Sequence, residues 1–529
     1  MRQFAGAIIM FAAAMSSGAT SVLAQKQGGT LRVYQRENPP SASILEEATI
    51  STAFPFSPLF NNLVMYDPQK PLEGADTIIP ELAESWSLDG TRTKLTFKLR
   101  SGVSWHDGKP FSAKDVLCTF DLVNGVTEGA RKSPRKIWYD NVEKIAADSD
   151  TQVTFHLKAP QPALLNLLAS GLSPIYPCHV SARDMRTKPI GTGPFKLAEL
   201  KSNESIKLVR NPAYWKKDRP YLDAIESRII SSRSTRILAF MAGQFDLTTV
   251  DDVTIPLLRD VATQAPKAVC SLNAAGTYAN LMVNHTAPPF DNPQARRAMM
   301  LTLDRKSFID IMGEGKLGIG GAMMPLPDGR WGMPPEMQAS LPGYGADVEQ
   351  SRAEGRRIME ALGYSKDNKL KLKITTRALD TYKDAAVILV DHLRAIHIEG
   401  ELFVADSSVW YNIMQKKDYT VALNVTGVGI DDPDANLVEN FLCKSERNFT
   451  RYCNAEVDTM IAEQSQEEDV EKRKRIVWAI EKKLIEDAAR PVIYHSRSGT
   501  CWYQNVKGIV RHHNSIYNQW RFEDVWLDK

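Results

Sequence analysis

The sequence predicts a mixed α/β protein that folds as more than one domain. Segments with strand periodicity and segments with helix periodicity alternate along the chain, which places helices against the faces of sheets. The chain has 529 residues, more than one hydrophobic core normally organises, so two or three domains are expected. Because no long linker or low-complexity tract separates them, we expect crossing strands to join the domains.

The composition is that of an ordinary globular protein. Hydrophobic residues make up 43% of the chain and charged residues 24%. The formal net charge of +2 gives no reason to expect a nucleic acid or an anionic membrane as a partner.

The first residues predict export. Arg2 is followed by an apolar run, residues 4–15, that is too short to span a bilayer. Residues 22–24, Val-Leu-Ala, fit a cleavage site, so we expect a signal peptide over 1–24 and a mature, periplasmic chain that begins at Gln25. No cysteine lies near the cut, which argues against a lipid anchor. An uncleaved membrane anchor is the alternative.

Residues 80–121 predict two strands, two turns and a helix. Leu95, Phe97 and Leu99 alternate with polar residues, as in a half-buried strand. Asp-Gly at 89–90 and Asp-Gly-Lys-Pro at 107–110 are turn signals. Ser112 stands three residues before Asp115, which is the spacing of a capping box that opens a helix.

Later segments carry further turn and cap signals in a fixed order. Gly-Thr-Gly-Pro-Phe at 191–195 reads as a turn that enters a strand, and 211–216 as a turn before a strand over 225–230. A helix begins at 234–236 and ends at 242–247. A strand ends at 282–284, and Asn292 caps a helix.

Together, residues 80–121, 191–195, 211–216, 242–247 and 291–298 resemble the family 5 extracellular solute-binding proteins, the dipeptide, oligopeptide and nickel receptors of bacterial ABC importers. The resemblance implies a two-lobed periplasmic binding protein (type II, Venus-flytrap, cluster C) with an extra domain inserted in the first lobe. We expect lobe I over 25–59, 188–285 and 496–529, the inserted subdomain over 60–187, and lobe II over 286–495. The chain would cross between lobes near 283–290 and 491–499.

The same resemblance implies a receptor that closes around a solute by hinge motion and leaves the solute chemically unchanged. The expected ligand is a peptide or another carboxylate-bearing small molecule, delivered to a permease and its ATPases in the inner membrane. Receptors for nickel or metal chelates, and for opine or sugar conjugates, are alternatives within the family. We expect a monomer without a cofactor.

Arg377 is the first candidate for contact with the ligand. It ends an alternating strand before a helix, where ligands sit in open α/β sheets. The resemblance implies that an arginine here holds a peptide carboxylate, to which a guanidinium offers a two-pronged fork. A solvated arginine at a strand end is the alternative.

Residues 425–436 form the second candidate region. In peptide-binding relatives an aromatic residue follows the first glycine, here Gly427, and an aspartate then grips the α-amino group. Val428 and Gly429 stand at those two positions, so the amine clamp is missing. Asp431 is a candidate replacement, although an acid beside Pro and Asn is also a turn former. Arg377 and Gly429 together favour an anionic ligand.

Five aromatic or acidic residues complete the expected site. Trp410 and Tyr411 begin a helix and either stack on a ligand or pack that helix on its sheet. The positions expected to face the cleft from the other lobe are Tyr34, Glu37 and Phe54.

The six cysteines predict at least one disulfide in an oxidising compartment. Cys443 and Cys453 bracket a polar loop, and the resemblance agrees with a bridge there. Cys118 lies on the apolar face of a predicted helix, where we expect a buried thiol. The sequence leaves Cys178, Cys270 and Cys501 unassigned.

No catalytic or metal motif stands in its required context. Residues 313–318 read GxGxxG, but they follow a helix-like run and not a strand. The chain has no GxSxG, HExxH or P-loop lysine, and the adjacent pair His512 and His513 would alternate faces on a strand. We therefore predict no metal site and no enzyme, with a periplasmic hydrolase as the alternative from another class.

Overall fold

The computed structural model describes residues 25–250 and 252–529, so the expected signal peptide, 1–24, lies outside the described residues. The strands β1–β17 are Thr30–Gln35, Val64–Tyr66, Ile78–Pro80, Ala83–Leu88, Lys94–Leu99, Val142–Ser149, Gln152–Leu157, Phe195–Lys201, Ser205–Arg210, Ala224–Ile229, Ala268–Val283, Leu370–Arg377, Ile398–Ala405, Val421–Gly427, Val492–Tyr503, Val506–Lys507 and Trp526–Leu527. The helices α1–α15 are Ile50–Phe56, Ala113–Asn124, Leu164–Ala169, Ala182–Met185, Arg233–Met241, Ile255–Gln264, Pro293–Leu301, Arg305–Gly313, Pro335–Ala339, Val348–Ala361, Asp380–Leu393, Ser407–Lys416, Glu439–Phe441, Ala455–Gln466 and Val470–Glu486.

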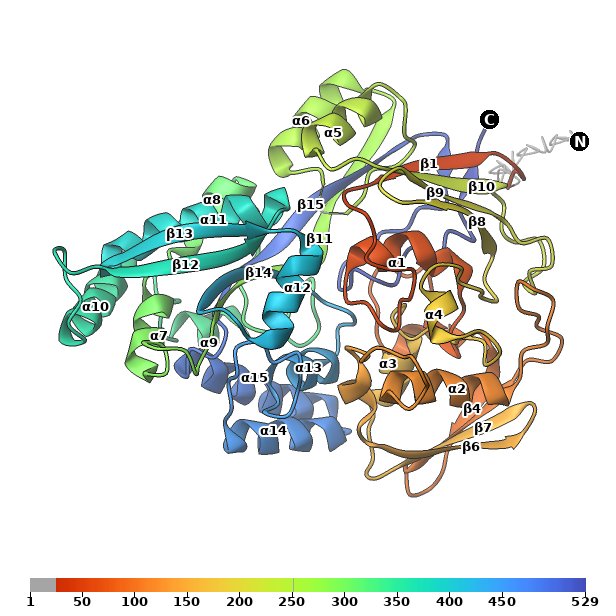
Figure 1. The fold of residues 1–529 in the computed structure, drawn as a ribbon, viewed down its shortest axis with the longest axis horizontal. Helices are drawn as coiled ribbons and strands as arrows, with labels where there is room; N and C mark the ends of the chain where they lie inside the picture. Colours follow the sequence, from red (N-terminus) through yellow and green to blue (C-terminus); the bar gives the residue numbers. More distant parts are fainter. Residues whose placement is uncertain (1–24, 251) are drawn as a thin grey trace, which may run out of the picture.

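Three larger sheets organise the two lobes. A four-stranded sheet has the order β1-β10-β9-β8, and a second one has the order β4-β5-β7-β6. Both lie in the half drawn at the right of Figure 1, with α1–α4 between and beside them. The five-stranded sheet β13-β12-β14-β11-β15 lies in the other half with α7, α8, α10 and α11. The predicted α/β fold with two lobes is confirmed.

Each lobe has its own hydrophobic core. The larger core joins residues before 276 to the C-terminal segment and contains Phe97 and Phe155. The second core packs β12 and β14 against α11 through Ile374, Leu389 and Leu423. Of these elements, β12 is the alternating strand that the sequence predicts before Arg377. The exact lobe boundaries remain a prediction.

The predicted helix after Ser112 forms as expected. Leu95, Phe97 and Leu99 point into the core from β5. Ser112 caps α2, and its backbone N–H donates to Asp115 Oδ2 at 2.9 Å. This reciprocal contact satisfies donors that the first helical turn otherwise leaves unpaired.

Two long strands run between the lobes. β11 and β15 pair antiparallel from Ala268 opposite Tyr503 to Asn280 opposite Val492, and the register shifts between Ala274 and Tyr278. Figure 1 shows both strands continuing from the five-stranded sheet toward α5 and α6. The two strands therefore form a paired ribbon, and the exact crossing points remain a prediction.

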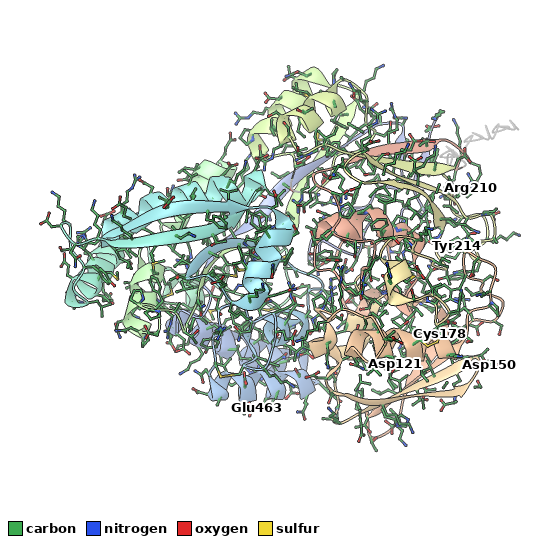
Figure 2. The ribbon with its side chains drawn as sticks, viewed as in Figure 1. Asp121, Asp150, Cys178, Arg210, Tyr214 and Glu463 are labelled. Atoms are coloured by element: carbon green, nitrogen blue, oxygen red, sulfur yellow. A yellow bond between two sulfur atoms is a disulfide. The ribbon has the colours of Figure 1, made fainter. Side chains whose placement is uncertain are left out.

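Three disulfides close the fold. Cys443 pairs with Cys453, the pair that the sequence favours, and Cys270 pairs with Cys501 across the β11–β15 ribbon. The expectation of a buried thiol at Cys118 is wrong, because Cys118 is bonded to Cys178. Figure 2 labels the position of Cys178. The backbone N–H of Cys178 donates to Asp115 Oδ1 at 2.9 Å, which holds the second cysteine against the start of α2.

Two absences hold for the described residues. Within 25–250 and 252–529, no helix combines the length and the apolar character that crossing a bilayer needs. The same residues contain no group of three or more His, Cys, Asp or Glu side chains placed to hold a metal ion.

Candidate functional site

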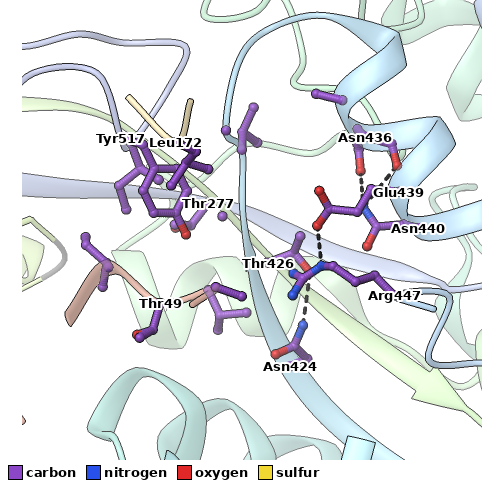
Figure 3. A pocket seen from close by; sticks show the side chains of 18 of the residues that line it. Thr49, Leu172, Thr277, Asn424, Thr426, Asn436, Glu439, Asn440, Arg447 and Tyr517 are labelled. Carbon is purple, nitrogen blue, oxygen red and sulfur yellow. Dashed lines mark hydrogen bonds and ion pairs between the residues drawn. The ribbon is translucent and has the colours of Figure 1, made fainter. Parts of the chain in front are cut away.

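A central pocket lies between the lobes. It contains about 980 Å³ of space free of protein atoms, including its opening to solvent. One side comes from the segment after β1, from the turn 135–138 and from Leu172, and the other from β12, β14 and residues 410–449. In Figure 3, Leu172 and Tyr517 face the strand that carries Asn424 and Thr426.

The wall of the central pocket is strongly cationic. Among the described residues, five arginines and a single carboxylate, Glu439, line it, with no lysine or aspartate. Because a buried guanidinium is costly without a partner, such a lining favours a ligand with negative charge. The five are Arg36, Arg135, Arg377, Arg447 and Arg490.

Arg377 sits at the end of β12 and contacts protein groups with all three of its side-chain nitrogens. Nη2 donates to Glu37 Oε1 at 3.0 Å, Nη1 to the Tyr382 hydroxyl at 3.0 Å and Nε to the Ser407 hydroxyl at 3.1 Å. The Arg377 side chain is only 3% exposed. The carboxylate partner of Arg377 in this structure is therefore Glu37, a group of the protein itself.

Glu37 reaches Arg377 from the other lobe. It follows β1 and accepts hydrogen bonds from the hydroxyls of Ser51, at 2.5 Å, and Ser407. Burial raises the pKa of Glu37, but Arg377, Arg36 and the two hydroxyls outweigh burial and hold that pKa below its ordinary value. Glu37 is thus charged at neutral pH and joins the lobes across the central pocket.

Arg135, Arg447 and Arg490, called here the arginine triad, line the central pocket together. Arg447 forms an ion pair with Glu439 (Figure 3). Arg490 donates only to neutral groups, Asn280, Asn440 and Thr426, at 2.7–2.8 Å.

Arg135 is also without a carboxylate. Its Nη1 donates to the backbone carbonyl of Glu47. In the described part of the chain neither Arg135, 4% exposed, nor Arg490, 5% exposed, makes an ion pair. Burial lowers the pKa of both guanidinium groups.

Trp410 and Tyr411 line the central pocket from the start of α12. The Arg377 guanidinium lies 5.9 Å from the Trp410 ring centroid and 5.3 Å from that of Tyr411. Trp410 is buried against Phe449, and the Tyr411 hydroxyl donates to the Ala48 carbonyl at 3.3 Å on the opposite side. These aromatic rings both pack α12 and shape the pocket.

Gly427 and Gly429 line the central pocket where β14 ends. A Cβ at Gly427 would lie 2.8 Å from the Tyr517 hydroxyl, so a side chain there would clash. A Cβ at Gly429 would lie 3.4 Å from both the Trp138 ring and Leu172. Gly429, where the sequence predicts that the amine clamp is missing, therefore lines the pocket without an acidic side chain.

Four expected residues are absent from the lining of the central pocket: Glu37, which contacts the lining residue Arg377, and three others. The Asp431 carboxylate accepts from the Arg330 backbone at 2.8 Å and from Asn514 at 3.0 Å. Tyr34 packs edge-on against Phe245, with ring centroids 5.2 Å apart. Phe54 is buried beneath Trp520 in the first core, 5.5 Å between centroids. None of the three side chains is placed to meet a solute in this pocket.

Several lining residues were not predicted. Arg447 lies in the loop that the Cys443–Cys453 bridge closes, and Arg490 directly precedes the expected return crossing at 491. Both positions offered a signal, since a charged residue beside a clipped loop or a crossing strand is close to the cleft. Arg135 and Tyr517 carried no such local signal.

The pocket wall also holds buried donors without acceptors. Among the described residues, the indole nitrogens of Trp138 and Trp410, the Nε of Arg36 and the hydroxyl of Thr277 have no hydrogen-bond partner. Buried polar groups are normally paired, so these donors indicate a ligand rich in acceptor oxygens.

Comparison with known proteins gives concordant results. The family model described as "Bacterial extracellular solute-binding proteins, family 5 Middle" matches residues 77–448. Among curated proteins, the chain is 26% identical to "Di/tripeptide-binding protein 2" of Pseudomonas aeruginosa over 490 residues, covering 86% of this chain and 87% of the relative.

Two solved structures illustrate the shared fold. The periplasmic binding protein DppA from Helicobacter pylori, in complex with the peptide STSA, superposes with a TM-score of 0.84 at 22% identity, covering 95% of this chain and 99% of DppA. AgaA from A. tumefaciens R10, in complex with agropinic acid, gives a TM-score of 0.83 at 21% identity with coverage of 95% and 99%.

Proposed function

The chain belongs to the family 5 bacterial extracellular solute-binding proteins, and from that membership we propose that it captures a small carboxylate-bearing solute in the central pocket for an ABC importer. The observation that carries this proposal is the lining of five arginines with one glutamate. A zwitterionic peptide carries an amine for which this wall offers one acid, already paired with Arg447. An acidic solute suits the wall better.

Arg377, Trp410, Tyr411, Gly427 and Gly429 are the proposed contacts among the residues that the sequence singles out. All five line the central pocket. The aromatic rings offer stacking faces, and the glycines let the main chain approach the solute. Glu37 acts on the solute indirectly, by pairing with Arg377.

Peptide capture is the second candidate. It is favoured by the relatives, whose names describe di- and tripeptide binding, and by the DppA complex with a tetrapeptide. The AgaA complex with agropinic acid gives the same fold a non-peptide ligand. The missing acid at Gly429 ranks an opine-like or other organic acid before a peptide.

Delivery and location complete the proposal. A signal peptide over 1–24 would export the chain to the periplasm, where the loaded monomer would meet a permease and its ATPases. The solute would leave chemically unchanged. Incubation of the protein with peptides and esters, followed by product analysis, tests the hydrolase alternative, and turnover would support that alternative.

Native mass spectrometry of protein purified without denaturation tests solute capture. We expect an added mass that is lost on denaturation, and a released compound that loses CO₂ on fragmentation. If no mass is retained and calorimetry detects no binding of dipeptides, tripeptides or organic acids, the proposed function is wrong.

A further inference from the structure

We propose that the arginine triad, Arg135, Arg447 and Arg490, binds an anionic oxygen group of the solute, a carboxylate or a phosphate, at a subsite distinct from Arg377. This inference rests on the proposed function, because it assumes that a solute enters the central pocket. It names the solute class: an acid whose negative charge is not balanced by an amine.

The first argument is the charge balance inside the triad. Glu439 stabilises all three cations, while Arg447 repels the other two, so the three guanidinium groups share one electrostatic environment. Only Arg447 is ion-paired with that acid. Within the described residues, two buried guanidinium groups thus remain without an anion, and because burying an unpaired charge is costly, a ligand anion is favourable there.

The second argument is an unpaired donor beside the triad. Trp138 is 3% exposed, and its indole N–H has no acceptor in the described structure. It stands in the same short turn as Arg135, Lys136–Tyr139, and its ring faces Gly429. Because an indole nitrogen only donates, its partner must be an acceptor such as an anionic oxygen.

The third argument is that Arg377 already has a carboxylate. The Nη2 of Arg377 donates a hydrogen bond to Glu37 at 3.0 Å, and its other two nitrogens donate to the hydroxyls of Ser407 and Tyr382. A solute carboxylate at Arg377 would have to displace Glu37 from a contact that joins the lobes. The triad requires no such exchange.

Sodium citrate and sodium phosphate are the probes for this subsite. Calorimetry and thermal melting would be run on wild type, Arg135→Gln and Arg490→Gln, with sodium chloride at matched ionic strength as the salt control. Citrate reports a carboxylate site and phosphate a phosphate site. Lys132→Gln is the matched variant, because Lys132 precedes the same turn but its side chain is 82% exposed and pairs with Glu446.

We expect at least one probe to bind wild type and Lys132→Gln equally. Its affinity should fall about 30-fold or more in Arg135→Gln and in Arg490→Gln, as for loss of a buried charge partner. Thermal melting without a probe verifies that each variant is folded. If one of the two triad variants does not fold, the other still tests the subsite.

Equal affinity in wild type and both triad variants would overturn the subsite, and so would the absence of binding by either probe to wild type. In either case a solute retained in native mass spectrometry would leave the proposed function standing. A wild type that retains no solute and binds no peptide or acid would remove the proposed function itself.

Discussion

Replacing Glu37 with glutamine tests whether the Glu37–Arg377 ion pair holds the lobes together. Glutamine keeps the size of the side chain and one acceptor oxygen but removes the charge. In the closed form, Arg377 is 3% exposed and Glu37 18% exposed, so the charge would be lost from a largely dehydrated contact. In an open form water would reach both side chains, and the variant would therefore weaken the closed form alone.

The expected magnitude follows from this burial. Removing one partner of a fully buried pair costs about 3–5 kcal/mol, and the residual exposure of Glu37 with the retained acceptor reduces this to about 2–3 kcal/mol. Because solute binding includes closure, affinity should fall about 30- to 150-fold. Calorimetry with the solute recovered from wild type measures the loss, and small-angle scattering measures the fraction of closed molecules.

Glu446→Gln is the matched control. The Lys132–Glu446 pair also spans the lobes, at 2.7 Å, but its side chains are 82% and 68% exposed. Exposed pairs contribute little, so the affinity of Glu446→Gln should equal that of wild type. Unchanged or tighter binding by Glu37→Gln would refute the reasoning, because Glu37 would then be competing with the solute for Arg377.

Three further changes have defined outcomes. Burial raises the pKa of Asp431 to about 7, so the free energy of unfolding of the wild type should fall as pH rises from about 4 to about 7. Urea unfolding of Asp431→Asn should show a flatter dependence on pH, and a dependence identical to that of the wild type would contradict this prediction. Replacing Cys443 and Cys453 with serine should lower the free energy of unfolding by about 2–3 kcal/mol, given their sequence separation of 10, and should weaken solute binding. An unchanged melting temperature would contradict a stabilising role for this disulfide. Gly429→Asp should raise the affinity for dialanine about tenfold or more by supplying an acid for the amine, with Gly429→Asn as the uncharged control that should gain nothing.

Local features of the fold were predictable because they depend on residues close in sequence. The alternation of Leu95, Phe97 and Leu99 and the capping box at Ser112 are complete within a few residues. The Cys118–Cys178 bridge joins residues 60 apart, and only the packing of the second cysteine against Asp115 reveals it. Features formed by residues close in sequence were therefore predicted, and the bridge between residues distant in sequence was not.

The candidate site divides in a similar way. Arg377 could be placed from the sequence because a strand end marks it, and the structure puts it on the central pocket. Its partner Glu37 comes from the other lobe, so the sequence could not pair the two. The arginine triad was not predicted, because what distinguishes Arg135 and Arg490 is the lack of a carboxylate partner in the described structure. The sequence does not show which side chains surround each arginine, so it cannot show that none of them is a carboxylate.

The ribbon of β11 and β15 is where we expect the two lobes to hinge. The Cys270–Cys501 bond lies within the run of paired residues that ends at Ala274, so the strands cannot slip past one another there. We expect bending at the following break in register, where Gly276 takes a φ of 63° and lies against the backbone of Ser515. A hinge at this place would let Glu37 return to the same position opposite Arg377 whenever the lobes close.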